Sequence, residues 1–284
     1  MKARLGTEVR TSLSEIVEVV LQTDALDDER SAHRERVGIR RFRARLATFR
    51  PVLRRGVVDD LDRRVRGLGT SLGAIRDLDV LAARLADHAA LLGVDAELWA
   101  VQVAAEREVA RRQLAVARAD PSHLRLRRDL VELATAPPFR RTADLSIPPE
   151  AFLVERVVFE SRRFVRSRDR LGVDPTEEQL HEFRKRIKRT RFVFETAAVR
   201  LGDELAAVTD QLAELATRLG ELQDAATARA WLLGHPCPPG AGDACAETHR
   251  ALVEHEAAVA VAARESSAVQ LAVTSRAIDA TTRP

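Results

Sequence analysis

The sequence has few aromatic residues and no long apolar run. Aromatic residues make up 4% of the 284 residues, with nine Phe, two Trp and no Tyr. This scarcity argues against a β-sandwich or barrel, whose strands depend on aromatic and β-branched residues. It also argues against proteins that stack single-stranded nucleic acid on aromatic rings. No stretch of uncharged apolar residues is long enough to span a bilayer, so we expect no transmembrane helix and no membrane partner.

Cysteine is equally scarce. The chain has only two cysteines, Cys237 and Cys245, which are too few for the disulfide framework of a small secreted protein. The first residues lack the apolar segment of a secretion signal, so the expected compartment is the cytoplasm. His235 and His249 lie near the cysteines, but the Cys-x7-Cys-x3-His spacing fits none of the common structural zinc patterns. We therefore predict two free thiols in a flexible loop, no metal site and no cofactor.

Helix-forming residues dominate, and strand-like alternation is nearly absent. Ala, Leu, Arg and Glu are good helix formers, and apolar residues recur at three- and four-residue spacing, as in Ile39, Phe42 and Leu46. A proline-bounded segment from Ala136 to Pro149 divides the chain near its middle. The pattern predicts an all-α protein. The predicted helices cover residues 7–25, 29–50, 52–70, 72–92, 95–119, 122–135, 149–171, 176–200, 203–233 and 244–278.

The cations are unusual in kind and in placement. Of 46 basic residues 43 are Arg, which donates bidentate hydrogen bonds to phosphate; a GC-rich genome would give the same bias. Residues 1–194 hold 39 basic and 30 acidic residues, whereas residues 195–284 hold 7 and 13. Arg30–Arg45 contains seven Arg and one acid, and His181–Arg191 contains six cations and one acid. Such blocks require an anionic partner or full exposure to water.

The two basic runs belong to a repeated pattern. A His is followed by cations at +3, +7, +8 and +10 in both His33–Arg43 and His181–Arg191, at an offset of 148 residues. A Leu-Gly-x-x-x-Asp segment follows each run, at Leu72–Asp77 and Leu219–Asp224, at an offset of 147 residues. Two motifs in the same order predict an internal duplication, in which the two basic helices take pseudo-twofold equivalent places.

A helical projection separates two kinds of cation in each run. With about 100° per residue, the His and the cations at +3, +7 and +10 fall within about 80° of each other, beside the apolar face. We expect this stripe at the edge of the core or of a cavity, and other cations of the run on a wetter face. The stripe residues are His33, Arg36, Arg40, Arg43, His181, Arg184, Lys188 and Arg191, and the wetter candidates are Arg41, Lys185 and Arg189.

Like charges on one stripe repel each other, so the stripes require anions. Carboxylates of the chain itself, such as Asp77, Asp79 and Asp224, would neutralise them in a charged helix–helix interface. Alternatively, both repeats hold an external anion, or the charges form a solvated face without a role. The first two alternatives are compatible if Asp77 and Asp224 orient some of the arginines.

The repeated His-x-x-Arg-x-x-x-(Arg/Lys)-Arg-x-Arg helix and the Leu-Gly-x-x-(Arg/Gln)-Asp segment resemble those of the conserved-histidine α-helical domain, CHAD. The segments Leu180–Arg189 and Leu72–Val80 match closely, and the resemblance covers residues 7–270. It implies two similar helical bundles around a central basic cavity. The implied organisation is a single domain over residues 1–284, with bundles at 7–135 and 150–278 and a linker at 136–149.

The resemblance also implies a binding protein and not an enzyme. Family members bind inorganic polyphosphate, and bacterial ones associate with polyphosphate granules in the cytoplasm. Carried onto this chain, the contacts are the stripe residues and the wetter candidates named above, and phosphate or sulfate ions would fit the same site. Polyphosphate carries about one negative charge per phosphate, so counterion release would drive binding and salt would weaken it.

The second copy departs from the family pattern at two positions. Gln223 replaces the usual cation before Asp224, and Ala226 stands where the first copy has Asp79. These departures imply that the second Asp-containing motif is degenerate and has no clear role in binding. We expect the acidic last 90 residues to form an outer side that does not contact ligand.

Three other functions remain alternatives. Basic helices also bind nucleic acid, although no helix-turn-helix or zinc module is recognisable here and the net charge is only +3. An enzyme for phosphorylated substrates would use His and Arg to stabilise a phosphoryl transition state. Neither motif offers a nucleophile or a pair of metal-binding carboxylates, so we predict no catalytic residues. A structural scaffold that docks onto another protein is the third alternative.

Overall fold

Long helices make up the computed structural model, which describes residues 4–24 and 31–281. Over these residues an isolated bridge between Leu53 and Phe139 is the only β-pairing, and the all-α prediction is confirmed. The predicted helix start at residue 29 and Arg30 lie outside the described ranges. The helices are α1 (Leu5–Asp24), α2 (Ser31–Phe49), the short 3-10 helix η1 (Arg50–Val52), α3 (Arg55–Leu92), α4 (Glu97–Ala119), α5 (Pro121–Thr135), α6 (Pro149–Arg168), α7 (Glu177–Leu201), α8 (Asp203–Gly234) and α9 (Gly242–Thr281).

The predicted break between helices 52–70 and 72–92 is wrong. Residues 55–92 form the single 38-residue helix α3. Leu61, Val65, Leu72 and Ile75 are all buried along it. Their three- to seven-residue spacing keeps them on one face, so the apolar stripe continues through the expected break and the helix continues with it.

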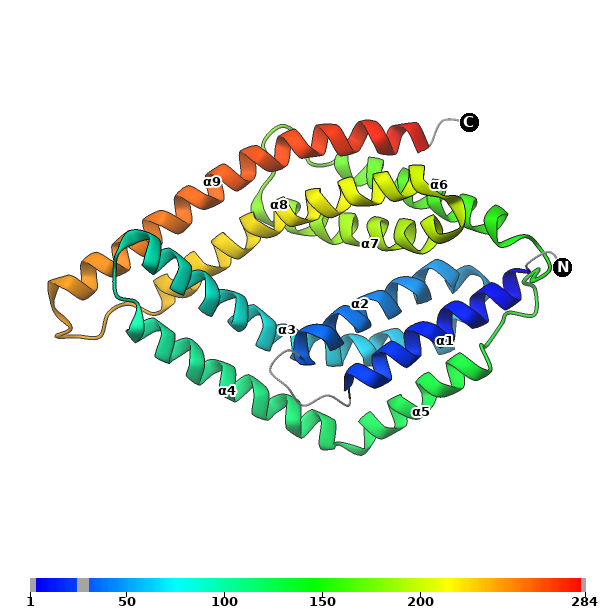
Figure 1. Cartoon of the computed structure of the whole chain (residues 1–284), viewed down its shortest axis with the longest axis horizontal. Coiled ribbons are helices and arrows are strands. Elements are labelled where there is room, and N and C mark those ends of the chain that lie inside the picture. The colour runs from blue at the N-terminus through cyan, green and yellow to red at the C-terminus, as the bar shows by residue number, and fades with distance from the viewer. Residues whose placement is uncertain (1–3, 25–30, 282–284) are drawn as a thin grey trace.

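Figure 1 shows the helices in two groups, with α1–α5 in the lower half of the view and α6–α9 in the upper half. The groups meet where α2 packs against α7, and again where α3 packs against α8 and α9. One large apolar core runs through both groups, with Phe42 of α2 and Phe183, Ile187 and Phe194 of α7 fully buried in it. The apolar faces of the two basic helices therefore anchor them at the centre of the molecule.

The start of α7 is set by a capping box. The Thr176 hydroxyl accepts a hydrogen bond from the Gln179 backbone N–H at 3.2 Å, and the Gln179 side-chain oxygen accepts one from the Thr176 N–H at 2.8 Å. Such reciprocal bonds satisfy two backbone donors that a helix start leaves free. The cap fixes the rotational register of α7 directly before His181.

A second apolar cluster closes the far end of the molecule, at the left of Figure 1. Trp99 is buried there against Leu232 of α8 and Leu252 of α9. Cys237 and Cys245 form a disulfide across the α8–α9 loop, with their Cα atoms 6.1 Å apart. The prediction of two free thiols is therefore wrong, because the fold of the loop brings both side chains together. Within the described ranges, no helix has the length and apolar character needed to cross a membrane.

Candidate functional site

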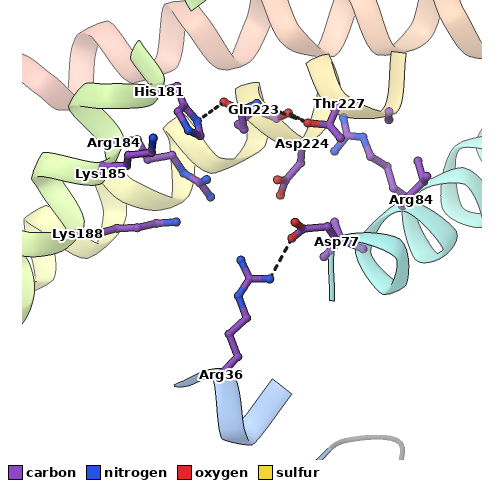
Figure 2. Close-up of a pocket in the computed structure, with 13 residues that line it drawn as sticks. Arg36, Asp77, Arg84, His181, Arg184, Lys185, Lys188, Gln223, Asp224 and Thr227 are labelled. Carbon is purple, nitrogen blue, oxygen red and sulfur yellow. Dashed lines mark hydrogen bonds and ion pairs between the residues drawn. The ribbon is translucent and has the colours of Figure 1, made fainter. Parts of the chain in front are cut away.

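A cavity of about 300 Å³ lies between α2, α3, α7 and α8. Figure 2 shows its charged side chains converging from these four helices. Lysine and arginine nitrogens meet two carboxylates, and α7 provides most of the cations. The polar and charged lining consists of Arg36 from α2, Asp77 and Arg84 from α3, His181, Arg184, Lys185 and Lys188 from α7, and Gln223, Asp224 and Thr227 from α8.

A second cavity of about 740 Å³ adjoins the first along α7. Lys185 and Lys188 line both cavities, and we call the two adjoining cavities together the basic groove. The second cavity adds further cations from α2, η1, α3 and α7 to its wall. Those cations are Arg40, Arg43, Arg50, Arg63, Arg66 and Arg189.

The carboxylates of the chain neutralise only part of the predicted stripe. Arg36 is paired with Asp77 at 3.0 Å, and Arg43 is held by Asp62 through two hydrogen bonds of 2.7 and 3.2 Å. Across the described residues, no ion pair involves Arg40, Arg184, Lys188 or Arg191, which are the other cations of the two stripes. The expected charged helix–helix interface therefore exists in part, while Arg40, Arg184 and Lys188 in the cavity walls have no ion pair among the described residues. Arg191 lies near Arg40 but lines neither cavity.

Polar atoms of these arginines also lack partners. The Nε atoms of Arg40, Arg184 and Arg191 are buried, and their N–H groups donate no hydrogen bond to any described residue. Asp79, which we considered as a neutralising acid, instead pairs with Arg107 at 2.7 Å. Buried unpaired donors cost free energy, so these arginines keep hydrogen-bonding capacity for an acceptor.

The pKa values of two groove cations also reflect the closeness of like charges. Burial, together with the charges of Arg184, Arg40 and Arg36, lowers the pKa of Lys188 from its usual 10.5 to about 7, although Asp224 opposes the shift. Burial and the neighbouring arginines lower the pKa of Arg40 to about 10. Removing a cation from water while placing like charges beside it disfavours its charged form. An anion in the groove would reverse both effects.

The Leu-Gly-x-x-x-Asp segments explain how the arginines reach the groove. Arg36 Nη1 donates to the Gly73 carbonyl at 3.2 Å and to Asp77, one helical turn later. Arg184 lies against Gly220 in the same way, with its pKa lowered by burial and partly restored by Asp224. A glycine permits a guanidinium to lie on the helix backbone, and the following Asp faces its charge.

The two glycines make a matched pair for substitution. A Cβ at Gly220 would lie 2.8 Å from Arg184 Nη2, whereas a Cβ at Gly73 would lie 3.7 Å from Arg36 Nη1. We expect Gly73→Ala to raise the free energy of unfolding by about 0.5–1 kcal/mol through helix propensity, with anion binding unchanged. We expect Gly220→Ala to displace Arg184 and weaken anion binding about fivefold, corresponding to about 1 kcal/mol of a charge-assisted contact.

Chemical denaturation and anion titration of the two variants would check this expectation. Because both substitutions are the same chemical change on a helix, each serves as the control for the other. Equal effects of the two on binding would show that Arg184 does not depend on the close approach at Gly220.

The two histidines differ in position. His181 lines the first cavity, and its Nδ1 donates to the Gln223 side-chain oxygen at 2.8 Å, so Nε2 is the nitrogen left for another partner (Figure 2). His33 is exposed and is absent from the lining of both cavities. Its pKa is lowered by partial burial and by Arg76, Arg40 and Arg36. The structure therefore brings only one of the two predicted histidines into the groove.

The predicted wetter cations have mixed positions. Arg41 is exposed and pairs with Glu195 at 3.6 Å, outside both cavities. Lys185 is exposed and paired with Glu182 at 2.6 Å, but it also lines both cavities. Arg189 is exposed and lines the second cavity.

Asp224 was expected to neutralise an arginine, but Gln223, Thr227 and Arg84 were not expected in the cavity lining. Gln223, Asp224 and Thr227 line the first cavity, so the expected outer, ligand-free position of this acidic part is wrong for α8. Packing of α8 against α7 brings these residues inward, and burial raises the pKa of Asp224. Arg84 follows Asp77 by two helical turns on the same face of α3, a spacing that could have identified it.

Arg84 is held in place from the α8–α9 side. It donates to the fully buried Glu256 at 2.7 Å and to Glu221 at 2.6 Å, and His88 contacts Glu256 at 2.8 Å. A buried ion pair of this kind is costly to break. The network therefore ties α3 to α8 and α9 and holds that wall of the cavity.

Comparisons with known proteins agree with this architecture. The family model of the CHAD domain matches residues 11–233. PptA from Streptomyces chartreusis aligns with a TM-score of 0.78 at 17% identity, covering 94% of this chain and 99% of that chain. The crystal structure of the CHAD domain from the plant Ricinus communis aligns with a TM-score of 0.70 at 22% identity, covering 96% and 92%. No curated protein matches the sequence.

Proposed function

The chain belongs to the CHAD domain family, and from this premise we propose that it binds inorganic polyphosphate in the basic groove. The observation that carries the proposal is the set of groove cations without an ion pair among the described residues, Arg40, Arg184 and Lys188, with Arg191 beside Arg40. Their spacing along two packed helices suits a linear ligand that presents one charge after another. We propose granules of polyphosphate as the place where the protein acts.

The proposed contacts divide into three kinds. Arg40, Arg184, Lys188 and Arg191 would bind phosphate oxygens directly, because they have no carboxylate to release. Arg36, Arg43 and Lys185 already have carboxylate partners and would share them with the ligand. His181 and Arg189 would add donors at the two ends of the groove, while His33 and Arg41 would act at its rim.

Binding without catalysis is the second part of the proposal. The carboxylates that line the groove are all opposed by arginines. Asp77, Asp62 and Asp59 form ion pairs with Arg36, Arg43 and Arg50, and Asp224 faces Arg184. Such a lining stabilises a bound anion without supplying a nucleophile. We expect no turnover of polyphosphate or triphosphate, with or without magnesium, when products are followed over time.

A titration tests the proposal against its nucleic-acid alternative. Purified protein is titrated with long-chain polyphosphate and with duplex DNA of matched charge, at two salt concentrations. Counterion release weakens both as salt rises, but a shaped groove of cations should retain polyphosphate at a salt concentration that releases DNA. Equal loss of both ligands would mean only a basic surface and would contradict the proposal.

A further inference from the structure

We propose a second phosphate-binding site on α6 and α7, next to the basic groove, with which it shares Arg189. We call it the arginine cluster, and it would bind phosphate groups of inorganic oligophosphates. The proposal extends the proposed function to longer chains, but binding of a short phosphate probe at the cluster does not depend on the groove. Its members are Arg156, Arg163, Arg166, Arg186 and Arg189.

A single carboxylate lies among these cations. Glu160 is fully buried and lies 3.4 Å from Arg156 Nη2 and 3.5 Å from Arg186 Nη1. Arg163, Arg166 and Arg189 form no ion pair with any described residue. The cluster therefore keeps a large positive excess around one acid, which buried and half-buried cations tolerate only with an external anion or water beside them.

Hydrogen bonding within the cluster is also incomplete. Arg156 Nε is buried and forms no hydrogen bond within the described part of the chain, and the buried Arg186 Nη1 has only its 3.5 Å ion-pair contact with Glu160. The Arg156 side chain is only 12% exposed, and that of Arg186 is 20% exposed. These guanidiniums are fixed in place by packing, so an arriving phosphate would meet donors that are already ordered.

Phe159 indicates what kind of ligand the cluster suits. The ring is 44% exposed, and the guanidiniums of Arg156 and Arg163 lie 4.7 and 5.5 Å from its centroid. Cations over an aromatic face are held by its quadrupole. The ring is thus used to position two arginines, which favours a ligand recognised by charge, such as phosphate, over a base that must stack.

Electrostatic crowding supports the same conclusion. Burial lowers the pKa of Arg186, and Arg163, Arg189 and Arg166 lower it further, while Glu160 raises it. Burial likewise lowers the pKa of Arg156, where Arg189 and Arg163 oppose Glu160. The groups that face these two residues from α6 and α7 are therefore almost all cationic.

Arg189 connects the cluster to the groove. It lines the second cavity and also faces Arg156 and Arg186. A polyphosphate longer than the groove would pass Arg189 and reach the cluster, gaining contacts without a new binding event. Chains of this length should bind more tightly than chains that fill the groove alone, because the second contact is intramolecular.

The test counts bound tripolyphosphate by isothermal titration calorimetry. The cluster variant R163Q/R166Q removes two cations that the fold does not pair, and R112Q/R276Q removes two exposed cations on α4 and α9 as a control. We expect the cluster variant to bind one tripolyphosphate per chain fewer than the wild type, and the control to bind as many as the wild type. Circular dichroism verifies that both variants remain helical.

The groove variant R40Q/K188Q separates this proposal from the proposed function. If the groove does not bind phosphate, this variant keeps the wild-type number of sites, whatever the cluster does. If the cluster does not bind phosphate, R163Q/R166Q keeps the wild-type number and affinity, and the second site is overturned. A loss in the cluster variant alone would support the cluster while contradicting the groove.

Discussion

Replacing Arg40 and Lys188 together by glutamine is expected to weaken polyphosphate binding by at least about tenfold, equivalent to about 1.4 kcal/mol. Both side chains lie in the centre of the groove, where burial and neighbouring cations already lower their pKa values. Neither has a carboxylate partner among the described residues, so neither has a structural ion pair to lose. Direct titration with long-chain polyphosphate at constant salt measures the effect.

The same double variant should be at least as heat-stable as the wild type. Removing two half-buried like charges relieves repulsion, so the loss of binding should come with an unchanged or higher Tm. The control R112Q/R276Q makes an equal change of charge on exposed surfaces and should bind nearly as the wild type does. A double variant that unfolds, or one that binds at full strength, would contradict the groove as described.

Polyphosphate affinity is expected to fall about tenfold between about pH 6 and about pH 8. The pKa of Lys188 is about 7 in the free protein, and bound phosphate would restore it toward its usual 10.5. The protonated fraction of Lys188 therefore falls about tenfold over this range, and binding that requires the charged form falls with it. Long chains are the proper probe, because only their terminal phosphates titrate near pH 6.

Stability of the free protein should change with the opposite sign. The unfolded chain keeps Lys188 charged up to about pH 10.5, whereas the folded chain releases this proton at about pH 7. Between these values the unfolded state binds more protons, so Lys188 makes the folded protein more stable as pH rises. Urea unfolding at several pH values, with and without ligand, measures both trends.

K188Q is the control for this pH dependence. The groups that face Lys188 are Arg184 on its own helix, Arg36 and Arg40 on α2, and Asp224 on α8. Of these, Asp224 also gains a proton as pH falls, and burial raises its pKa. K188Q should therefore keep only the small slope that Asp224 produces. A slope equal to that of the wild type would mean that Lys188 is not the group that titrates.

The geometry of the groove agrees in part with the helical projection of the sequence. Arg36, Arg40, Arg184 and Lys188 lie beside the apolar faces of α2 and α7, as their spacing predicts, and all four line the groove. The projection placed these four residues correctly because Phe42 of α2 and Phe183 of α7 are buried on one side of each helix. Their burial fixes how each helix is rotated about its axis. His33 is exposed near the start of α2, and neither His33 nor Arg191 lines the two cavities.

Other features depended on neighbours distant in the chain. Whether an arginine is neutralised was decided by Asp62 and Asp77 of α3, whose positions relative to α2 no local pattern reveals. The inward position of Asp224 depends on how α8 packs against α7. The Cys237–Cys245 disulfide depends on the path of the α8–α9 loop, which residue spacing does not specify.

Residue type and spacing determined the elements of this protein and the faces they bury. Helix propensity, apolar periodicity and the repeated cationic pattern are local properties, so they could be evaluated from the chain alone. Tertiary structure decided which cations meet carboxylates and which have no ion pair among the described residues. That outcome depends on distances of a few ångströms between helices far apart in sequence, where Coulomb energies and desolvation change most steeply.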